Sequence, residues 1–337
     1  MSEKKKSAAG TLTLLVLCCV LGGCKADTPA AGTDITRVSV LLPHFDDGYW
    51  TLIEEGIEQS GAELKKNCGM DIKILKPQLN YNIPQMVELL KQQIAAKVDV
   101  LVVQGNEDEE YINTLKEAWS EGIQIICVDT DIKSFPEHLY IGTDNYEAGK
   151  MLGEELINVT DGEANVAVIS GEPGFSNLEE RLEGLQDAIK DCPKIHLGDV
   201  QYDNYDGLTV MKMYYQNAED ADTIVFLEGT GGISISAQFK QRDNQYEHIL
   251  GFDAFDGVIS GVIDGIIKQD TRRMGEQVVE EIANYIRNGE YSSETWGTGG
   301  CGTGGRGSGT WGSGTCGTGT CIPGTCRPQA GNRPPGY

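Results

Sequence analysis

The chain has 337 residues and a formal net charge of −24, with 39% hydrophobic and 23% charged residues. This length suits one large domain or two of ordinary size, with enough apolar residues for a buried core. The acidic balance argues against nucleic acid and anionic lipid surfaces as partners, because both would repel the protein.

The first predicted element is an export signal. Lys4–Lys6 precede a short apolar run over residues 11–21. A basic flank followed by about ten apolar residues is typical of a secretory signal, and the run is too short to span a bilayer. Residues 21–24, Leu-Gly-Gly-Cys, resemble a bacterial lipobox. We therefore predict a lipoprotein signal peptide over 1–23, lipidation at Cys24, and an extracytoplasmic protein anchored to the bacterial cell membrane.

A small, polar tether over 24–35 leads into a regular alternation of strands and helices. The predicted strands are Val38–Leu42, Ile72–Leu75, Val98–Val103, Ile123–Val128, Leu139–Ile141, Val166–Ser170, Thr223–Leu227 and Ile249–Phe252, with another before Tyr202. The predicted helices cover residues 49–66, 83–96, 109–121, 144–158, 177–190, 205–218, 232–241 and 273–288. Short apolar strands separated by helices predict parallel sheets covered on both faces.

The alternation breaks around residues 130–143, where Pro136 interrupts it. We interpret this segment as a crossing between two lobes, with the last helix returning to the first lobe. The predicted fold class is α/β, with two doubly wound parallel-sheet lobes joined by a hinge. The N-terminal lobe is predicted over 36–130 plus 270–296, and the C-terminal lobe over 131–269.

The composition changes at the C-terminus. Residues 297–337 contain 15 glycines, four cysteines, three arginines and no acid. Such a low-complexity tail buries too little apolar surface to fold. The sequence allows a reading frame lost near Trp296, a glycine-rich spacer, or a metal or disulfide knot at Cys316, Cys321 and Cys326. Under any of these, we expect the tail to supply no strand.

Polar side chains follow the predicted strands at their carboxyl ends, where ligands bind in open parallel sheets. They include Asp129, Asp203, Glu228 and Asp253, each of which follows a strand. Arg181 lies on the helix that follows the predicted strand Val166–Ser170. Sugar hydroxyls both donate and accept, so a carboxylate or a planar arginine can bind two of them. Aromatic rings cover the apolar faces of a sugar. These residue types in this arrangement predict a sugar site.

The chain resembles the type I periplasmic sugar-binding proteins of the ribose and galactose group, the solute receptors of ATP-driven importers. The resemblance covers residues 36–290 and rests on VSVLLPHFDDGYW, VDVLVVQG, IQIICVDTD, YIGTDNYEAGKMLGE, ERLEGLQDAI and ILGFDAFD. It implies two lobes that are joined by three crossing strands and close on a ligand. It also implies a monomer that delivers a monosaccharide to ABC permease subunits.

The resemblance implies a role for individual residues in ligand binding. The polar contacts would come from Asp47, Asp129, Arg181, Asp253 and the hinge-side amide Gln269, and the aromatic ones from Tyr49, Trp50 and Tyr202. Thr130 stands where ribose-type receptors carry arginine, and Gly229 where they carry asparagine. The sugar therefore need not be ribose. Arg181→Ala is expected to lose the ligand and keep the fold.

Two other function classes are a sensor and an enzyme. A sensor would use the same fold to present a sugar or furanosyl signal to a membrane histidine kinase or chemoreceptor. An enzyme is not expected, because the sequence contains no nucleophile elbow, phosphate loop or metal set. We predict no cofactor, no metal and no nucleic-acid partner.

Overall fold

The computed structural model describes residues 35–43, 48–239, 241, 245–253, 260–291, 296–297 and 299–303. The predicted signal, the lipidation site Cys24, the candidate residue Asp47 and the tail beyond residue 303 lie outside these ranges. Among the residues described, none of the helices combines the length and apolar character needed to cross a membrane.

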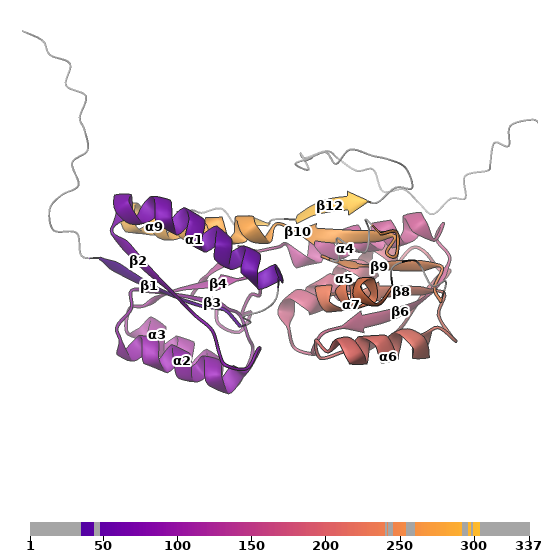
Figure 1. Cartoon of the computed structure of the whole chain (residues 1–337), viewed down its shortest axis with the longest axis horizontal. Helices are drawn as coiled ribbons and strands as arrows, with labels where there is room; N and C mark the ends of the chain where they lie inside the picture. Colours follow the sequence, from indigo (N-terminus) through magenta and orange to yellow (C-terminus); the bar gives the residue numbers. More distant parts are fainter. Residues whose placement is uncertain are drawn as a thin grey trace, which may run out of the picture. The chain divides into compact units, whose positions relative to one another are not determined.

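The first lobe is a sheet with helices on both faces (Figure 1). Its strands are β1 (Thr36–Leu41), β2 (Met70–Leu75), β3 (Val100–Gln104), β4 (Gln124–Val128) and β5 (Leu139–Gly142). All are parallel, in the order β5-β4-β3-β1-β2. One face is covered by α1 (Gly48–Cys68) and α9 (Thr271–Asn288), the other by α2 (Ile83–Ala95) and α3 (Glu109–Ser120). Most side chains of the inner strands β1, β3 and β4 are buried on both faces, which explains their continuous apolar sequence.

The second lobe repeats this arrangement. Its strands are β6 (Ala164–Ser170), β7 (Ile195–Tyr202), β8 (Thr223–Phe226), β9 (His248–Phe252) and β10 (Gly265–Gln269), parallel in the order β10-β9-β8-β6-β7. One hydrophobic core lies under α4 (Asn145–Val159) and α5 (Ser176–Ile189), and the other under α6 (Gly207–Asn217) and α7 (Gly229–Gln238). The predicted fold class is confirmed.

One lobe boundary and one strand differ from the sequence-based expectation. β5, which falls within the predicted C-terminal lobe 131–269, pairs with β4 in the first sheet, so the chain crosses at residues 143–144. β10 was not predicted, because it begins at a glycine and carries the exposed Lys268 in only five residues. The return crossing lies between β10 and α9, at Asp270.

The glycine-rich tail contributes strands, contrary to expectation. β11 (Trp296–Gly297) pairs in parallel with β5 in the first sheet. β12 (Gly299–Thr303) pairs antiparallel with β10 in the second. Ladder hydrogen bonds come from the backbone, so a segment with small side chains can supply them. β11 and β12 thus stand where the resemblance places the third crossing strand, which the tail was not expected to supply.

Glycines allow two helix pairs to cross with their backbones in contact. A Cβ at Gly149 of α4 would lie 2.1 Å from the carbonyl oxygen of Arg181, and one at Gly184 of α5 would lie 2.0 Å from that of Tyr146. In the first lobe, Gly56 of α1 and Gly275 of α9 meet their partner helices in the same way. The α4–α5 crossing fixes the helix that carries Arg181.

Gly149→Ala should therefore destabilise the protein by about 1–3 kcal/mol, because a methyl group has no room at the crossing. The free energy of unfolding in urea measures this. Gly48→Ala is the matched control, since a Cβ there meets nothing within 4 Å. Equal stability of the two variants would contradict the packing described.

Candidate functional site

A cleft open to solvent is lined by residues from both lobes. The first lobe contributes Tyr49, Trp50, Tyr81, Gln104 and Asp129. The second contributes Asn177, Leu178, Arg181, Tyr205, Glu228, Gly229, Thr230, Ile233, Asp253 and Gln269. Most follow the carboxyl ends of strands, as expected for a parallel sheet.

Asp129 and Asp253 occupy equivalent places in the two lobes. Each directly follows a strand, β4 or β9, with a left-handed backbone, at φ 70° and 55°. Each backbone N–H donates to the next strand, to Ile141 O at 3.0 Å and Ile267 O at 3.1 Å. Aspartate tolerates this conformation better than most residues. The turn aims both carboxylates into the cleft, where they line its wall.

Gln269 connects the two lobes at the end of β10. Its Oε1 accepts from Thr143 Oγ1 at 2.8 Å and Arg181 Nη2 at 2.9 Å, and lies 3.2 Å from Tyr49 Oη. Its Nε2 donates to Asp253 Oδ2 at 2.7 Å. Burial raises the pKa of Asp253 to about 6, although the Gln269 hydrogen bonds act in the opposite direction. Gln269 thus joins the hinge to both walls of the cleft.

Arg181 is buried, with 2% of its surface exposed. Its Nε donates to Asn145 Oδ1 and its Nη1 to Leu227 O, both at 2.9 Å. Its guanidinium lies 4.0 Å above the centre of the Phe252 ring, in cation–π contact. The side chain therefore has a structural role, because it donates to buried acceptors from three different segments.

Two tyrosines from opposite lobes stack against each other at the cleft. The Tyr81 and Tyr205 ring centres are 5.1 Å apart, with planes 15° from parallel. Both residues have a φ of 54° in loops that follow the second strand of their lobes. Trp50 Nε1 donates to Tyr81 Oη at 2.7 Å. Both lobes therefore bring to the cleft aromatic side chains of the type that covers the apolar faces of a sugar.

Most of the predicted site residues come together. Six of them line the cleft: Tyr49, Trp50, Asp129, Arg181, Asp253 and Gln269. Their contact with a ligand stays a prediction. Tyr202 does not line the cleft and is 40% exposed, and Tyr205, three residues later, is there instead. Nine lining residues were not among the predicted ligand contacts: Tyr81, Gln104, Asn177, Leu178, Tyr205, Glu228, Gly229, Thr230 and Ile233. Of these, Glu228, Gly229 and Thr230 carried a signal, their place directly after a predicted strand.

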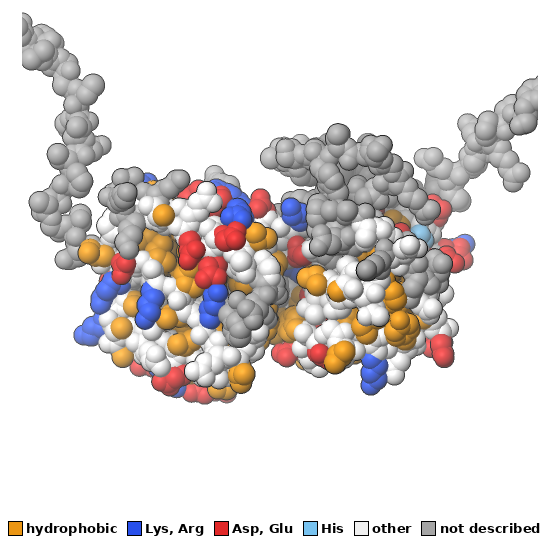
Figure 2. Space-filling model, in the orientation of Figure 1, with side chains coloured by type: hydrophobic (Ala, Val, Ile, Leu, Met, Phe, Trp, Pro, Cys, Tyr) orange, Lys and Arg blue, Asp and Glu red, His pale blue; other side chains and the backbone are white. Residues whose placement is uncertain are grey.

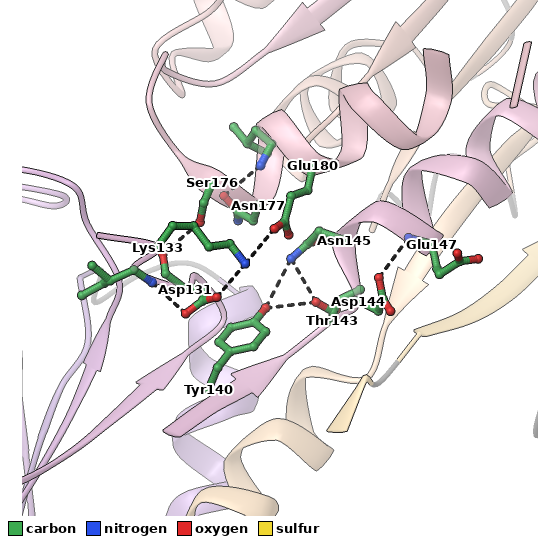
Figure 3. A network of polar contacts seen from close by, with 12 residues as sticks. Asp131, Lys133, Tyr140, Thr143, Asp144, Asn145, Glu147, Ser176, Asn177 and Glu180 are labelled. Atoms are coloured by element: carbon green, nitrogen blue, oxygen red, sulfur yellow. Dashed lines mark hydrogen bonds and ion pairs between the residues drawn. The ribbon is translucent and has the colours of Figure 1, made fainter. Parts of the chain in front are cut away.

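A polar network beside the first crossing joins the loop after β4 to the second lobe (Figure 3). Lys133 Nζ lies 2.7 Å from Asp131 Oδ2 and 2.8 Å from Glu180 Oε1 of α5. Ser176 Oγ donates to Asp131 O at 2.9 Å. Burial opposes ionisation of Asp131, but hydrogen bonds from His138 and Lys133 outweigh it and lower its pKa to about 2. This network attaches the loop after β4 to the second lobe.

A buried acidic pair lies beside the cleft. Asp203 is fully buried, and its Oδ1 accepts from Tyr205 N at 2.8 Å. Burial first, and then the charge of Glu228, raise the pKa of Asp203 to about 8. Glu228 caps α7 by accepting from Thr230 N at 2.5 Å and Gly231 N at 2.8 Å. In the described part of the chain, no group of three or more His, Cys, Asp or Glu could hold a metal ion.

The choice between Tyr205 and Tyr202 can be tested directly. Tyr205→Ala should weaken ligand binding about fivefold, because it removes an aromatic contact worth about 1 kcal/mol. Tyr202→Ala should change affinity by less than about twofold. Calorimetric titration with a bound monosaccharide measures both. A larger loss of affinity for Tyr202→Ala than for Tyr205→Ala would favour Tyr202 as the ligand contact.

Comparisons with known proteins agree with this geometry. A family model described as a periplasmic binding protein domain matches residues 38–290. The galactofuranose-binding protein YtfQ of Escherichia coli is 27% identical over 152 residues, 44% of this chain and 46% of that protein. Across the first three curated relatives, the chain spans 46–60% of their length.

Two solved structures share the fold. GanP, a glucose-galactose binding protein from Geobacillus stearothermophilus, superposes with a TM-score of 0.73 at 24% identity, covering 80% of this chain and 98% of that one. The XylFII-LytSN complex contains a chain with a TM-score of 0.68 at 21% identity, covering 77% of this chain and 95% of that one.

Proposed function

We propose that this chain, which belongs to the periplasmic binding protein family, captures a monosaccharide by closing its two lobes. The members of that family are extracytoplasmic, non-enzymatic sugar receptors of ABC transporters. The observation that carries this proposal is the cleft with carboxylates, an arginine and aromatic rings from both lobes. Hydroxyls and ring faces of a sugar match these groups.

Closure would shift a population between open and closed forms. On the first lobe the ligand would contact Asp129 and Tyr81. On the second it would contact Arg181, Tyr205 and Asp253. Buried polar groups left unpaired cost about 1–3 kcal/mol each, so a sugar with a wrongly placed hydroxyl would be rejected. The closed form would then dock on permease subunits as a monomer.

The lipid anchor is part of the proposal. It is supported by the signal-like start and the Leu-Gly-Gly-Cys sequence ending at Cys24. Mass spectrometry of the exported protein should find a diacylglyceryl group on the Cys24 thiol, and Cys24→Ser should release the protein from the membrane fraction. A chain cut elsewhere, with an unmodified Cys24, would remove the anchor from the proposal.

A sensor is the second candidate, in which the same cleft presents a sugar to a membrane receptor. The shared fold with a chain of the XylFII-LytSN complex supports it. Cross-linking in native membranes separates the two functions: recovery of permease subunits would favour import, and recovery of a histidine kinase would favour sensing.

A thermal-shift screen against monosaccharides, pentitols and furanosyl signals tests the binding function. A ligand at 100 times its dissociation constant stabilises by about 2.7 kcal/mol, which raises the melting temperature by several degrees in a protein of this size. A cooperative melt that no sugar or polyol shifts would contradict the proposal.

A further inference from the structure

The charges that line the cleft do not balance. In the described part of the lining, three residues are acids, Asp129, Glu228 and Asp253, and one is a base, Arg181. The face of the protein in Figure 2 carries acidic and basic side chains interspersed over the lobe with α1–α3. Inside the cleft, by contrast, the acids predominate.

Neutral donors hold these carboxylates. Asp129 accepts from Tyr49 Oη at 2.5 Å, Thr130 Oγ1 at 2.7 Å and Gln104 Nε2 at 3.5 Å. Asp253 accepts from the backbone and side-chain nitrogens of Gln269. Glu228 accepts from two backbone N–H groups. Among the described residues, no lysine or arginine forms an ion pair with any of the three.

Arg181 does not neutralise the acids by contact. Its described hydrogen bonds go to two amide oxygens and a backbone carbonyl, and its face rests on Phe252. A buried carboxylate without a cation is costly, and the cost grows when closure removes water. Each carboxylate also keeps acceptor capacity, since its two oxygens offer about four lone-pair sites.

A further buried acid lies beside the cleft with no basic partner among the described residues. Asp203 is fully buried, and its Oδ2 has no hydrogen-bond donor among the described residues. The group it faces is Glu228, so a hydrogen bond between them forms only when one of the two holds a proton. Burial raises the pKa of both Asp203 and Asp253, and the charge of Glu228 raises that of Asp203 further.

From this arrangement we propose that the ligand is an amino sugar or amino polyol whose ammonium group pairs with the carboxylates of the cleft. An ammonium donates three hydrogen bonds, accepts none, and brings the missing positive charge. The hydroxyls and ring of the same molecule would use Arg181 and the aromatic pair. This inference rests on the proposed function, because it specifies the ligand of the same site.

Calorimetric titration of the purified protein with matched sugars tests it. The probes are D-glucosamine and D-galactosamine, their parent hexoses, and the N-acetyl forms, which keep the nitrogen and lose the charge. We expect at least one amino sugar to bind about tenfold or more tighter than both its parent and its N-acetyl form. Glu228→Gln, a neutral side chain of nearly equal size, should reduce that ratio, with its melt confirming the fold.

The outcomes separate the two proposals. Neutral sugars that bind as tightly as their amino counterparts would overturn the charge inference and leave the receptor function standing. Failure of every neutral sugar, amino sugar and polyol in both this titration and the thermal screen would overturn both. An amino-sugar preference that Glu228→Gln and Asp253→Asn both leave unchanged would overturn the assignment of the carboxylates.

Discussion

Replacement of Arg181 by alanine should abolish ligand binding and lower the free energy of unfolding by about 3 kcal/mol. The side chain donates to Asn145, Leu227 and Gln269, all from within the protein. Removing it takes the donor from Asn145 Oδ1 and Leu227 O, while Gln269 Oε1 keeps the hydrogen bond from Thr143 Oγ1. Each buried acceptor that loses its donor costs about 1–3 kcal/mol before water enters. The sequence predicts only that the variant keeps its fold. The hydrogen bonds of Arg181 add that this fold should be less stable.

Urea unfolding and calorimetric titration of Arg181→Ala measure the two effects. Arg181→Lys is the informative control, because it keeps the charge and loses the planar fork. We expect it to recover part of the stability and little of the affinity. An Arg181→Ala protein as stable as the parent would show that the buried acceptors do not depend on this side chain.

Stability should fall as the pH rises from about 4 to about 8, because of Asp203. Its pKa is raised from 3.8 to about 8 by burial and by Glu228. In this window the unfolded chain has lost the proton that the folded protein keeps, so the unfolded state binds fewer protons. The free energy of unfolding therefore decreases with pH, and above about pH 8 no further loss comes from this group.

Asp203→Asn should remove this contribution, since an amide stays neutral and can donate to Glu228. At pH 9 the variant should be more stable than the parent by on the order of 2–5 kcal/mol, with a much smaller difference at pH 4. Urea unfolding across this range measures it. Asp199→Asn, an exposed change in β7, is the control. Parallel pH profiles for parent and Asp203→Asn would contradict a buried acid.

The strand pattern was enough to predict the fold class. Runs such as the one in β3 are apolar at successive positions because helices cover both faces of the sheet. β10 escaped because it is short and ends at a polar hinge residue, and β11 and β12 because their pairing needs only backbone. Those pairings depend on tertiary context that no local pattern contains.

The site residues that directly follow strands were predictable, and those placed by loops were not. Asp129 and Asp253 are fixed by adjacency to a strand end. Tyr205 enters the cleft through a turn in which it and Asn204 both have left-handed backbones, so counting from the strand selects Tyr202 instead. Arg181 lies among glutamates in sequence, yet the helix period turns it inward with Leu178 and Leu185.

Small-angle X-ray scattering of the protein with and without its sugar tests the central claim most directly. If the ligand is captured between the lobes, the radius of gyration should fall on addition of sugar and level off at the concentration that saturates calorimetric binding. Saturable binding with an unchanged radius of gyration would contradict capture by lobe closure.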